Sequence, residues 1–89
     1  MKQYEGEWKY GKMDGMGVYY YNKTGDIYRG SFSKGMRSGN GKLEYPNGDY
    51  YIGEWNEDKE NGSGSLFLSN GLTTVLMFNL YFFANSKSL

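Results

Sequence analysis

The chain has 89 residues and a mass of 10.2 kDa, enough for one small domain. Ten basic and ten acidic residues leave a formal net charge of zero, which argues against a nucleic-acid partner. The sequence contains no cysteine and no histidine, so disulfides, thiolate zinc sites, a thiol nucleophile and the commonest general base are excluded. Most enzyme classes are therefore disfavoured.

A unit of 23 or 24 residues recurs three times along the chain. Each unit opens with tyrosine, any residue, glycine, any residue and an aromatic residue. The openings are Tyr4-Glu5-Gly6-Glu7-Trp8, Tyr28-Arg29-Gly30-Ser31-Phe32 and Tyr51-Ile52-Gly53-Glu54-Trp55. A Gly-x-Gly pair, two alternate large apolar residues and a closing glycine turn follow in each unit. All 14 glycines fit this template, so we predict a repeat array.

Period-two alternation predicts that each opening is a β-strand with its tyrosine, glycine and aromatic residue on one face. The glycine is expected to leave a hole that a ring from the neighbouring repeat fills. The polar segment that follows, 9–14 in the first unit, is predicted to be a turn. Second strands are then expected at about 16–22, 40–45 and 63–68.

Turn signals close the units. Pro46-Asn47-Gly48-Asp49 is a strong reversal signal, because proline sets φ and glycine allows a positive φ. The first unit makes the same reversal over 22–26 with one residue more. The result is about six antiparallel strands in an up-and-down meander. Each hairpin is too small to bury its own face, so it must stack on its neighbours.

This pattern resembles the MORN (membrane occupation and recognition nexus) repeat from Tyr4 to about Leu72. The resemblance implies an all-β fold, a single-layer antiparallel meander of stacked hairpins with a shallow groove lined by aromatic residues. The array is placed at 1–72, with repeats at about 4–27, 28–50 and 51–73, followed by an apolar tail at 73–89. The resemblance also implies a scaffold, a homodimerisation module or a membrane-proximal adaptor, with catalysis left to separate domains.

Three departures from the template carry expectations of their own. Phe32 replaces tryptophan in the second unit, which is a tolerable exchange of aromatic rings. Asp58 replaces the first turn glycine of the third unit, so that turn is expected to differ in shape. A fourth unit starting at Thr74 fails, because its glycine positions hold Leu76, Asn85 and Lys87. The tail from Leu72 is therefore expected to be something else or a degenerate cap.

The aromatic stripe of the repeats is the first candidate site. It could form a groove that clasps an extended peptide or a partner helix, or it could be the core that holds the array together. The structural role is the favoured interpretation for most of the rings. The stripe consists of Tyr4, Trp8, Tyr28, Phe32, Tyr51 and Trp55.

Basic residues in the turns inside the repeats are the second candidate. Stacking would line them along one edge of the sheet, where they could meet anionic phospholipid or an acidic partner. Acidic residues share these turns, so a solvated polar edge is the favoured interpretation. The basic residues are Lys9, Lys12, Lys34, Arg37 and Lys59.

The apolar tail is the third candidate. The favoured interpretation is a terminal strand or short helix that caps the open end of the stack, and a self-association surface, an interfacial membrane anchor and a truncated end are alternatives. As a helix, 72–84 would reach only about 20 Å, less than the ~30 Å of a bilayer core. Its possible association residues are Leu76, Phe78, Leu80, Phe82 and Phe83.

The sequence thus favours a non-enzymatic protein-interaction or scaffold module that forms a homodimer through an end of the array. The alternatives are a peripheral module on anionic phospholipid and an accessory repeat segment of a larger protein. No catalytic residue, cofactor, metal, nucleic acid or small-molecule substrate is expected. Residues 1–6 contain no apolar signal segment, so we expect a cytoplasmic location. The resemblance adds a cytoskeletal or membrane-peripheral setting.

Overall fold

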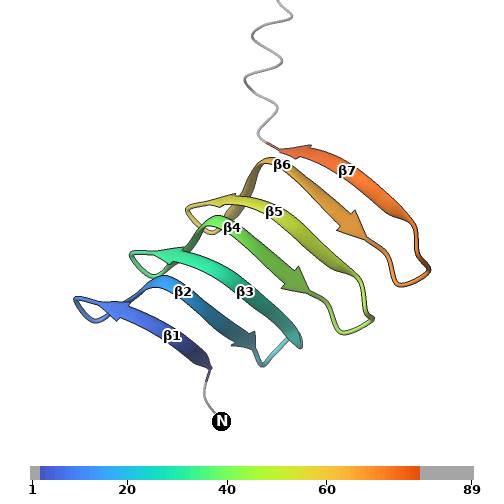
Figure 1. The fold of residues 1–89 in the computed structure, drawn as a ribbon. Helices are drawn as coiled ribbons and strands as arrows, with labels where there is room; N and C mark the ends of the chain where they lie inside the picture. Colours follow the sequence, from blue (N-terminus) through green and yellow to red (C-terminus); the bar gives the residue numbers. More distant parts are fainter. Residues whose placement is uncertain (1–2, 79–89) are drawn as a thin grey trace, which may run out of the picture.

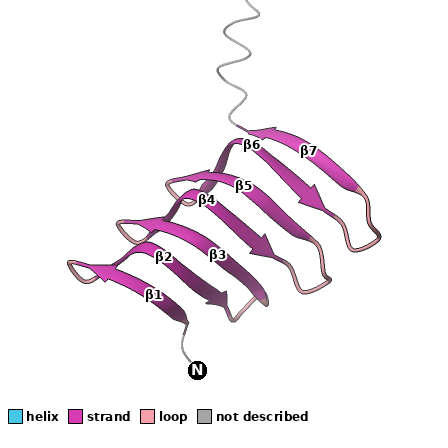
Figure 2. Ribbon diagram, in the orientation of Figure 1, coloured by secondary structure: helices cyan, strands magenta, loops and turns pink. Residues whose placement is uncertain are grey.

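The computed structural model describes residues 3–78, which form one seven-stranded antiparallel sheet in a single twisted layer (Figure 1). Each strand pairs with the next along the chain, and Figure 2 shows only strands and loops in the described part. The expected single-layer meander is confirmed. The strands are β1 (Tyr4–Lys9), β2 (Lys12–Tyr21), β3 (Asp26–Ser33), β4 (Met36–Glu44), β5 (Tyr50–Asn56), β6 (Lys59–Phe67) and β7 (Thr73–Phe78).

The turns inside the repeats are shorter than the sequence predicts. Lys9 pairs directly with Lys12, so only Tyr10 and Gly11 lie between β1 and β2. Both residues have positive φ, 50° and 76°, which is the backbone of a two-residue hairpin turn. The prediction of a turn over 9–14 is therefore wrong. The strands β2, β4 and β6 begin at 12, 36 and 59, each four residues before the expected position.

The third hairpin keeps this turn shape although it has no glycine. Glu57 and Asp58 have φ of 47° and 70°, close to the values of Tyr10 and Gly11. Aspartate tolerates this left-handed region better than most residues. The Asp58 amide donates to the Arg37 carbonyl at 3.1 Å, and the Asp58 carboxylate accepts from the Arg37 amide at 2.9 Å. The expectation that Asp58 changes the turn is therefore wrong, because these bonds hold the aspartate in place.

A bulge interrupts the pairing of the second strand in every repeat. In the first repeat, the three residues 14–16 of β2 lie opposite Glu7 alone. Gly15 has a φ of 88°, and the Glu7 carboxylate accepts a hydrogen bond from the Met16 amide at 2.6 Å. The register shifts at the same place in the β3–β4 and β5–β6 pairs, where Gly39 and Gly62 also have positive φ.

A tyrosine fills the space between the facing glycines of each repeat. Gly30 pairs with Gly41, and the Tyr28 ring lies over both, so a Cβ on either glycine would collide with the ring. The Tyr28 hydroxyl donates to the Ser31 carbonyl at 2.9 Å. Tyr4 and Tyr51 lie over their own glycine pairs in the same way. The expectation that a ring from the neighbouring repeat fills the hole is therefore wrong, because the side chain leans along its own strand.

The strand β7 takes the place of the first strand of a fourth repeat. Leu76 pairs with Gly64, and Phe78 pairs with Gly62, as Gly53 and Trp55 pair with Gly41 and Gly39. The tail therefore includes a terminal strand, as the favoured interpretation of the tail expects, although position 76 lacks the glycine of the repeat template. The backbone of β7 still pairs with that of β6, because strand pairing does not require a glycine at position 76.

The rest of the tail, 79–89, lies outside the described residues. This segment includes three of the expected association residues, Leu80, Phe82 and Phe83. Within 3–78 the structure contains no helix of the length and apolarity that a membrane crossing requires.

Candidate functional site

Seven aromatic side chains form a continuous chain on one face of the sheet, which we call the aromatic zipper. Consecutive ring centroids lie 4.9–5.6 Å apart with interplanar angles of 79–89°, the edge-to-face geometry that aromatic pairs favour. Each tyrosine contacts the aromatic residue of its own repeat and that of the next. The rings follow one another as Trp8, Tyr4, Phe32, Tyr28, Trp55, Tyr51 and Phe78. The structure thus brings together all six rings of the predicted stripe and adds one from the tail.

The middle of the aromatic zipper is buried, whereas its N-terminal end is open. Tyr28, Phe32, Tyr51 and Trp55 are at most 5% exposed and form the core with Leu43. Trp8 is 60% exposed, because no described residue lies on the side that faces away from the array. The rings in the middle therefore serve packing, whereas Trp8 at the N-terminal end is open to solvent.

An open hollow of about 480 Å³ lies beside Trp8. Its walls come from the first hairpin and from the turn of the second, so it opens at the N-terminal end of the sheet. Rings and aliphatic stems supply most of its surface. The lining residues are Gln3, Tyr4, Trp8, Gly11, Lys12, Met13, Tyr19 and Gly35.

Arg37 lies across the aromatic face rather than on the basic edge. Its guanidinium carbon is 4.3 Å from the centroid of the Trp55 ring and 5.5 Å from that of Tyr21. Its Nε lies 3.0 Å from a carboxylate oxygen of Asp58, and the side chain is 18% exposed. Cation–π contacts and this ion pair withdraw Arg37 from any anionic partner.

The four lysines of the predicted basic edge separate into two groups. Lys9, Lys12 and Lys34 line a hollow of about 300 Å³ together with Tyr10 and Asp14. They come from the first two hairpins, which makes this corner of the sheet basic. The fourth, Lys59, lies in the third hairpin among acidic side chains. The predicted edge is therefore not one continuous basic surface.

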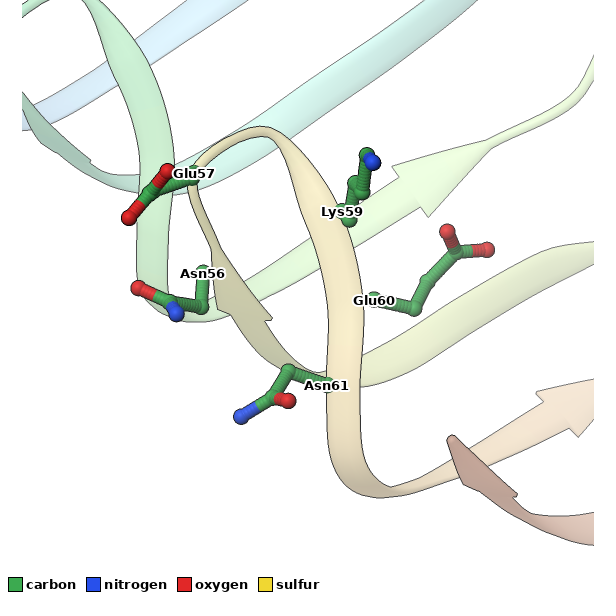
Figure 3. Close-up of a pocket in the computed structure, with 5 residues that line it drawn as sticks. All are labelled: Asn56, Glu57, Lys59, Glu60 and Asn61. Atoms are coloured by element: carbon green, nitrogen blue, oxygen red, sulfur yellow. The ribbon is translucent and has the colours of Figure 1, made fainter. Parts of the chain in front are cut away.

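A polar hollow of about 390 Å³ surrounds the hairpin between β5 and β6 (Figure 3). Figure 3 shows that the side chains fan out around the hairpin and do not converge on one point. Within 3–78 no group of three acidic residues could hold a metal ion. This arrangement is typical of a solvated turn. The lining residues are Asn56, Glu57, Lys59, Glu60 and Asn61.

The opposite face of the sheet carries charge in its centre and apolar residues toward β7. Arg29 and Lys42 each form an ion pair with Glu44, at 3.3 and 3.2 Å. Beyond them, the Tyr50 and Phe67 rings stack at 4.8 Å. The exposed side chains nearer β7 are Ile52, Val75 and Met77. The sequence analysis did not single out this face, although the alternation of the strands places these residues on it.

Burial raises the pKa of the zipper tyrosines. The pKa of Tyr28 rises to about 12 despite the opposing effect of the nearby Arg37 charge. Burial is also the largest cause of the raised pKa of Tyr4 and Tyr51, with nearby carboxylates adding to it. These hydroxyls stay protonated at neutral pH, so the rings act as packing groups and not as bases.

Comparison with known proteins accounts for the array. The sequence matches the family model of the MORN repeat over residues 4–25, 28–50 and 51–73. Alsin from Rattus norvegicus, Mus musculus and Homo sapiens is 50% identical to this chain over 40 residues, or 45% of the chain. The chain spans about 2% of the length of these curated relatives. The MORN repeat is a non-catalytic repeat type, and Alsin is a much larger protein in which such a segment occurs.

Proposed function

The chain belongs to the MORN repeat family, and from this premise we propose that it is a protein-interaction and scaffold module without enzymatic activity. The observation that carries the proposal is the pair of outer strands. Within the described residues β1 and β7 each pair with one neighbour only, so each leaves a row of backbone groups free for another chain. Exposed apolar side chains lie beside both edges.

The absence of a converging chemical site in the described part supports the non-enzymatic proposal. The buried face is made of aromatic and aliphatic residues, and no polar or charged side chain is buried in 3–78. The hollows are open and formed at turns and at the end of the sheet. Catalysis needs groups held in fixed geometry around a reacting atom, and this surface offers none.

We further propose that the C-terminal end mediates self-association as a homodimer. Leu72, Val75 and Met77 are exposed on or next to β7, at 62%, 73% and 47%. An uncovered edge strand with apolar side chains favours pairing with a second copy. The proposed setting is cytoplasmic, on cytoskeletal or membrane-peripheral assemblies.

Light scattering on the full chain tests the self-association proposal. We expect a dimer for the full chain and a monomer for a version that ends at Gly71. Because that truncation also removes Phe78 from the core, the sharper variant is Val75→Ser/Met77→Ser, which keeps the zipper intact. A dimer that persists in both forms would contradict the proposal, and Lys23→Ser in an exposed turn serves as the control substitution.

A second candidate function, association with anionic phospholipid, is favoured by the basic corner of Lys9, Lys12 and Lys34. Each basic residue near an anionic surface contributes about 1 kcal/mol. Co-sedimentation with anionic and neutral vesicles at two salt concentrations tests this candidate. Salt-sensitive binding to anionic vesicles that is lost when the three lysines become glutamine would support it. Equal sedimentation with both kinds of vesicle would exclude it.

A further inference from the structure

We infer that the N-terminal end of the aromatic zipper is a docking site for a β-hairpin of another polypeptide, one that places a glycine opposite Gly6 and a tyrosine ring against Trp8. The inference rests on the proposed interaction function and specifies the partner for one end of the sheet. The self-association proposed above uses the opposite end, so the two can fail separately.

The interior of the molecule shows what covers such a site. Trp55 occupies the same place in the third repeat as Trp8 in the first, and it is 3% exposed. The preceding repeat covers it, because the Tyr28 ring lies 5.4 Å from Trp55 and the Trp55 indole donates to the Gly41 carbonyl at 3.4 Å. Phe32 is covered in the same way by Tyr4, at 5.2 Å.

At the N-terminal end, half of this arrangement is present. Trp8 packs on Tyr4 of its own repeat at 4.9 Å, as Trp55 packs on Tyr51 at 5.6 Å. The outer side of Trp8 faces the hollow of about 480 Å³, and no described strand pairs with the outer edge of β1. The missing parts are therefore a strand beside β1 and a ring beside Trp8.

The glycines that pair across neighbouring strands restrict which partner strand can lie beside the outer edge of β1. Gly6 pairs with Gly17 on its inner side, and the Tyr4 ring lies over both. In the interior, the corresponding Gly53 has Gly64 on one side and Gly41 on the other. A partner strand in the same register thus brings a glycine to Gly6, because the tyrosine ring that the partner itself contributes lies over that glycine, as Tyr28 lies over Gly41.

Charge adds a second restriction. In the interior, the residue before Gly53 is Ile52, and it pairs with Lys42. The residue in the place of Ile52 on β1 is Glu5, which is exposed. A basic residue next to the glycine of the partner strand would therefore face a carboxylate, which is a favourable cross-strand pair.

Head-to-tail stacking of a second copy of the described sheet does not supply this strand. Its outer strands, β1 and β7, run in the same direction and hold the same place in the repeat. Stacking two copies end to end would place β7 parallel to β1, with Leu76 in the row where a glycine is required. The partner that reproduces the cover of Trp55 is a hairpin that presents a second strand of the repeat at its edge, as β4 does beside β5.

A cyclic peptide of residues 26–45 is a direct probe, because this hairpin contains Tyr28, Gly41 and Lys42 and covers Trp55 inside the molecule. Ile27 pairs with Glu44, so the peptide ends are close enough to be joined, and cyclisation reduces the ordering cost of binding. The peptide is titrated into the full-length isotope-labelled chain. We expect saturable shifts of the Trp8 indole resonance and the β1 amides, with the Trp55 indole unmoved.

Matched variants give the test its specificity. Trp8→Ala should weaken peptide binding by about tenfold or more, as expected for a central aromatic anchor. Tyr10→Ala removes a ring that is 92% exposed at the hairpin tip and outside the zipper, and it should change the affinity less than about twofold. The peptide variants Tyr28→Ala and Gly41→Val should both abolish the shifts.

Three results would overturn the inference. The first is no shift at Trp8 or β1 with about 1 mM of a cyclic peptide whose own Tyr28 and Gly41 resonances show the folded hairpin, since about 1 mM is the weakest affinity that we regard as docking. The second is unchanged binding by the Gly41→Val peptide. The third is a Trp8 shift caused by raising the concentration of the chain alone, since that would make a second copy the occupant. None of these results bears on a dimer formed through β7.

Discussion

Two glycines that face each other across neighbouring strands leave a space in the sheet, and one tyrosine ring occupies it in every repeat. Tyr28 fills the space over Gly30 and Gly41, and it is fully buried. The same ring then supports the aromatic residues of two repeats, because Phe32 and Trp55 both pack on it. Each repeat is thus tied to the next by a contact that depends on the small size of its glycines.

Gly53→Val tests this role of glycine. A Cβ at Gly53 would meet the Tyr51 hydroxyl and lie 2.7 Å from the Gly64 Cα, so the ring would have to leave its place. We expect a loss of roughly 2–3 kcal/mol in the free energy of unfolding. At this chain length that corresponds to about 10 °C or more in melting temperature.

Ser65→Val is the matched control for this substitution. It adds the same side chain on a neighbouring position of the opposite face, where Ser65 pairs with Ile52 and Val75. Valine suits such a strand position, so the melting temperature should stay the same or rise. An equal melting temperature for Gly53→Val and the unchanged chain would contradict the packing described above.

The buried tyrosines also predict that stability falls at alkaline pH. The pKa of Tyr28 is about 12 in the folded chain and about 10 in the unfolded chain. The unfolded chain therefore loses this proton first, so the free energy of unfolding is unaffected below pH 10 and decreases between about pH 10 and 12. Urea unfolding over this range measures the decrease. It should be smaller in Tyr28→Phe, and an equal decrease would contradict a buried Tyr28 hydroxyl.

At the scale of the elements, the hairpin turns show how one backbone shape is reached with different residues. The first two turns use glycine at their second position, and the third uses Asp58 with a φ of 70°. The third turn gains its stability from Arg37, whose guanidinium donates to the Asp58 carbonyl at 2.7 Å. That link joins the second and third repeats at the edge of the sheet.

Substitutions of Asp58 separate the contribution of its carboxylate from that of its left-handed backbone conformation. Asp58→Gly and Asp58→Ala both lose the carboxylate, but only alanine is strained by the left-handed backbone conformation. We expect Asp58→Ala to be less stable than Asp58→Gly by about 1–2 kcal/mol in urea unfolding. Equal stability of the two variants would mean that this turn does not keep its positive φ.

The spacing of the repeated residues predicted the strands. The prediction failed at positions where the residue type occurs in both strands and turns. The recurring Tyr-x-Gly-x-Trp and Gly-x-Gly groups predicted the meander, the paired strands and six rings of the zipper. The start of β2 was missed because Lys12 and Asp14 are polar and, with Gly11 and Gly15, resemble a turn. Lys12 in fact pairs with β1, and Asp14 belongs to the bulge of β2. Tyr10, Lys34 and Glu57 gave no sign of their positive φ.

Arg37 was missed for a different reason, whereas β7 agrees with the favoured interpretation of the tail as a terminal strand or short helix. The position of Arg37 follows from the bulge, which aligns it with Phe32 on the aromatic face. Nothing in the local sequence encodes that alignment. The template for the first strand required a glycine at position 76, whereas the structure places Leu76 there at the end of the array. In β5 the glycine is required because the Tyr51 ring of the same strand lies over Gly53, whereas β7 has Thr74 in the place of that tyrosine.

At the scale of the whole molecule, the rings inside the zipper pack on one another, and the surfaces proposed for binding lie at the two ends of the sheet. The rings from Phe32 to Tyr51 have partners on both sides, whereas Trp8 and Phe78 have one ring partner each among the described residues. We therefore propose that the sheet binds partners at its edge strands and end surfaces. The centre of the aromatic face has no room for a partner because its rings are buried.

The most direct test of this account is a concentration series of amide and indole spectra of the full chain, recorded up to the concentration at which light scattering shows a dimer. The account predicts that the resonances that change with concentration gather at β7 and the residues beside it, while β3, β4 and the Trp55 indole stay constant. Concentration-dependent changes centred on β3 to β5 would contradict it, because association would then use the face that the structure shows as a closed core.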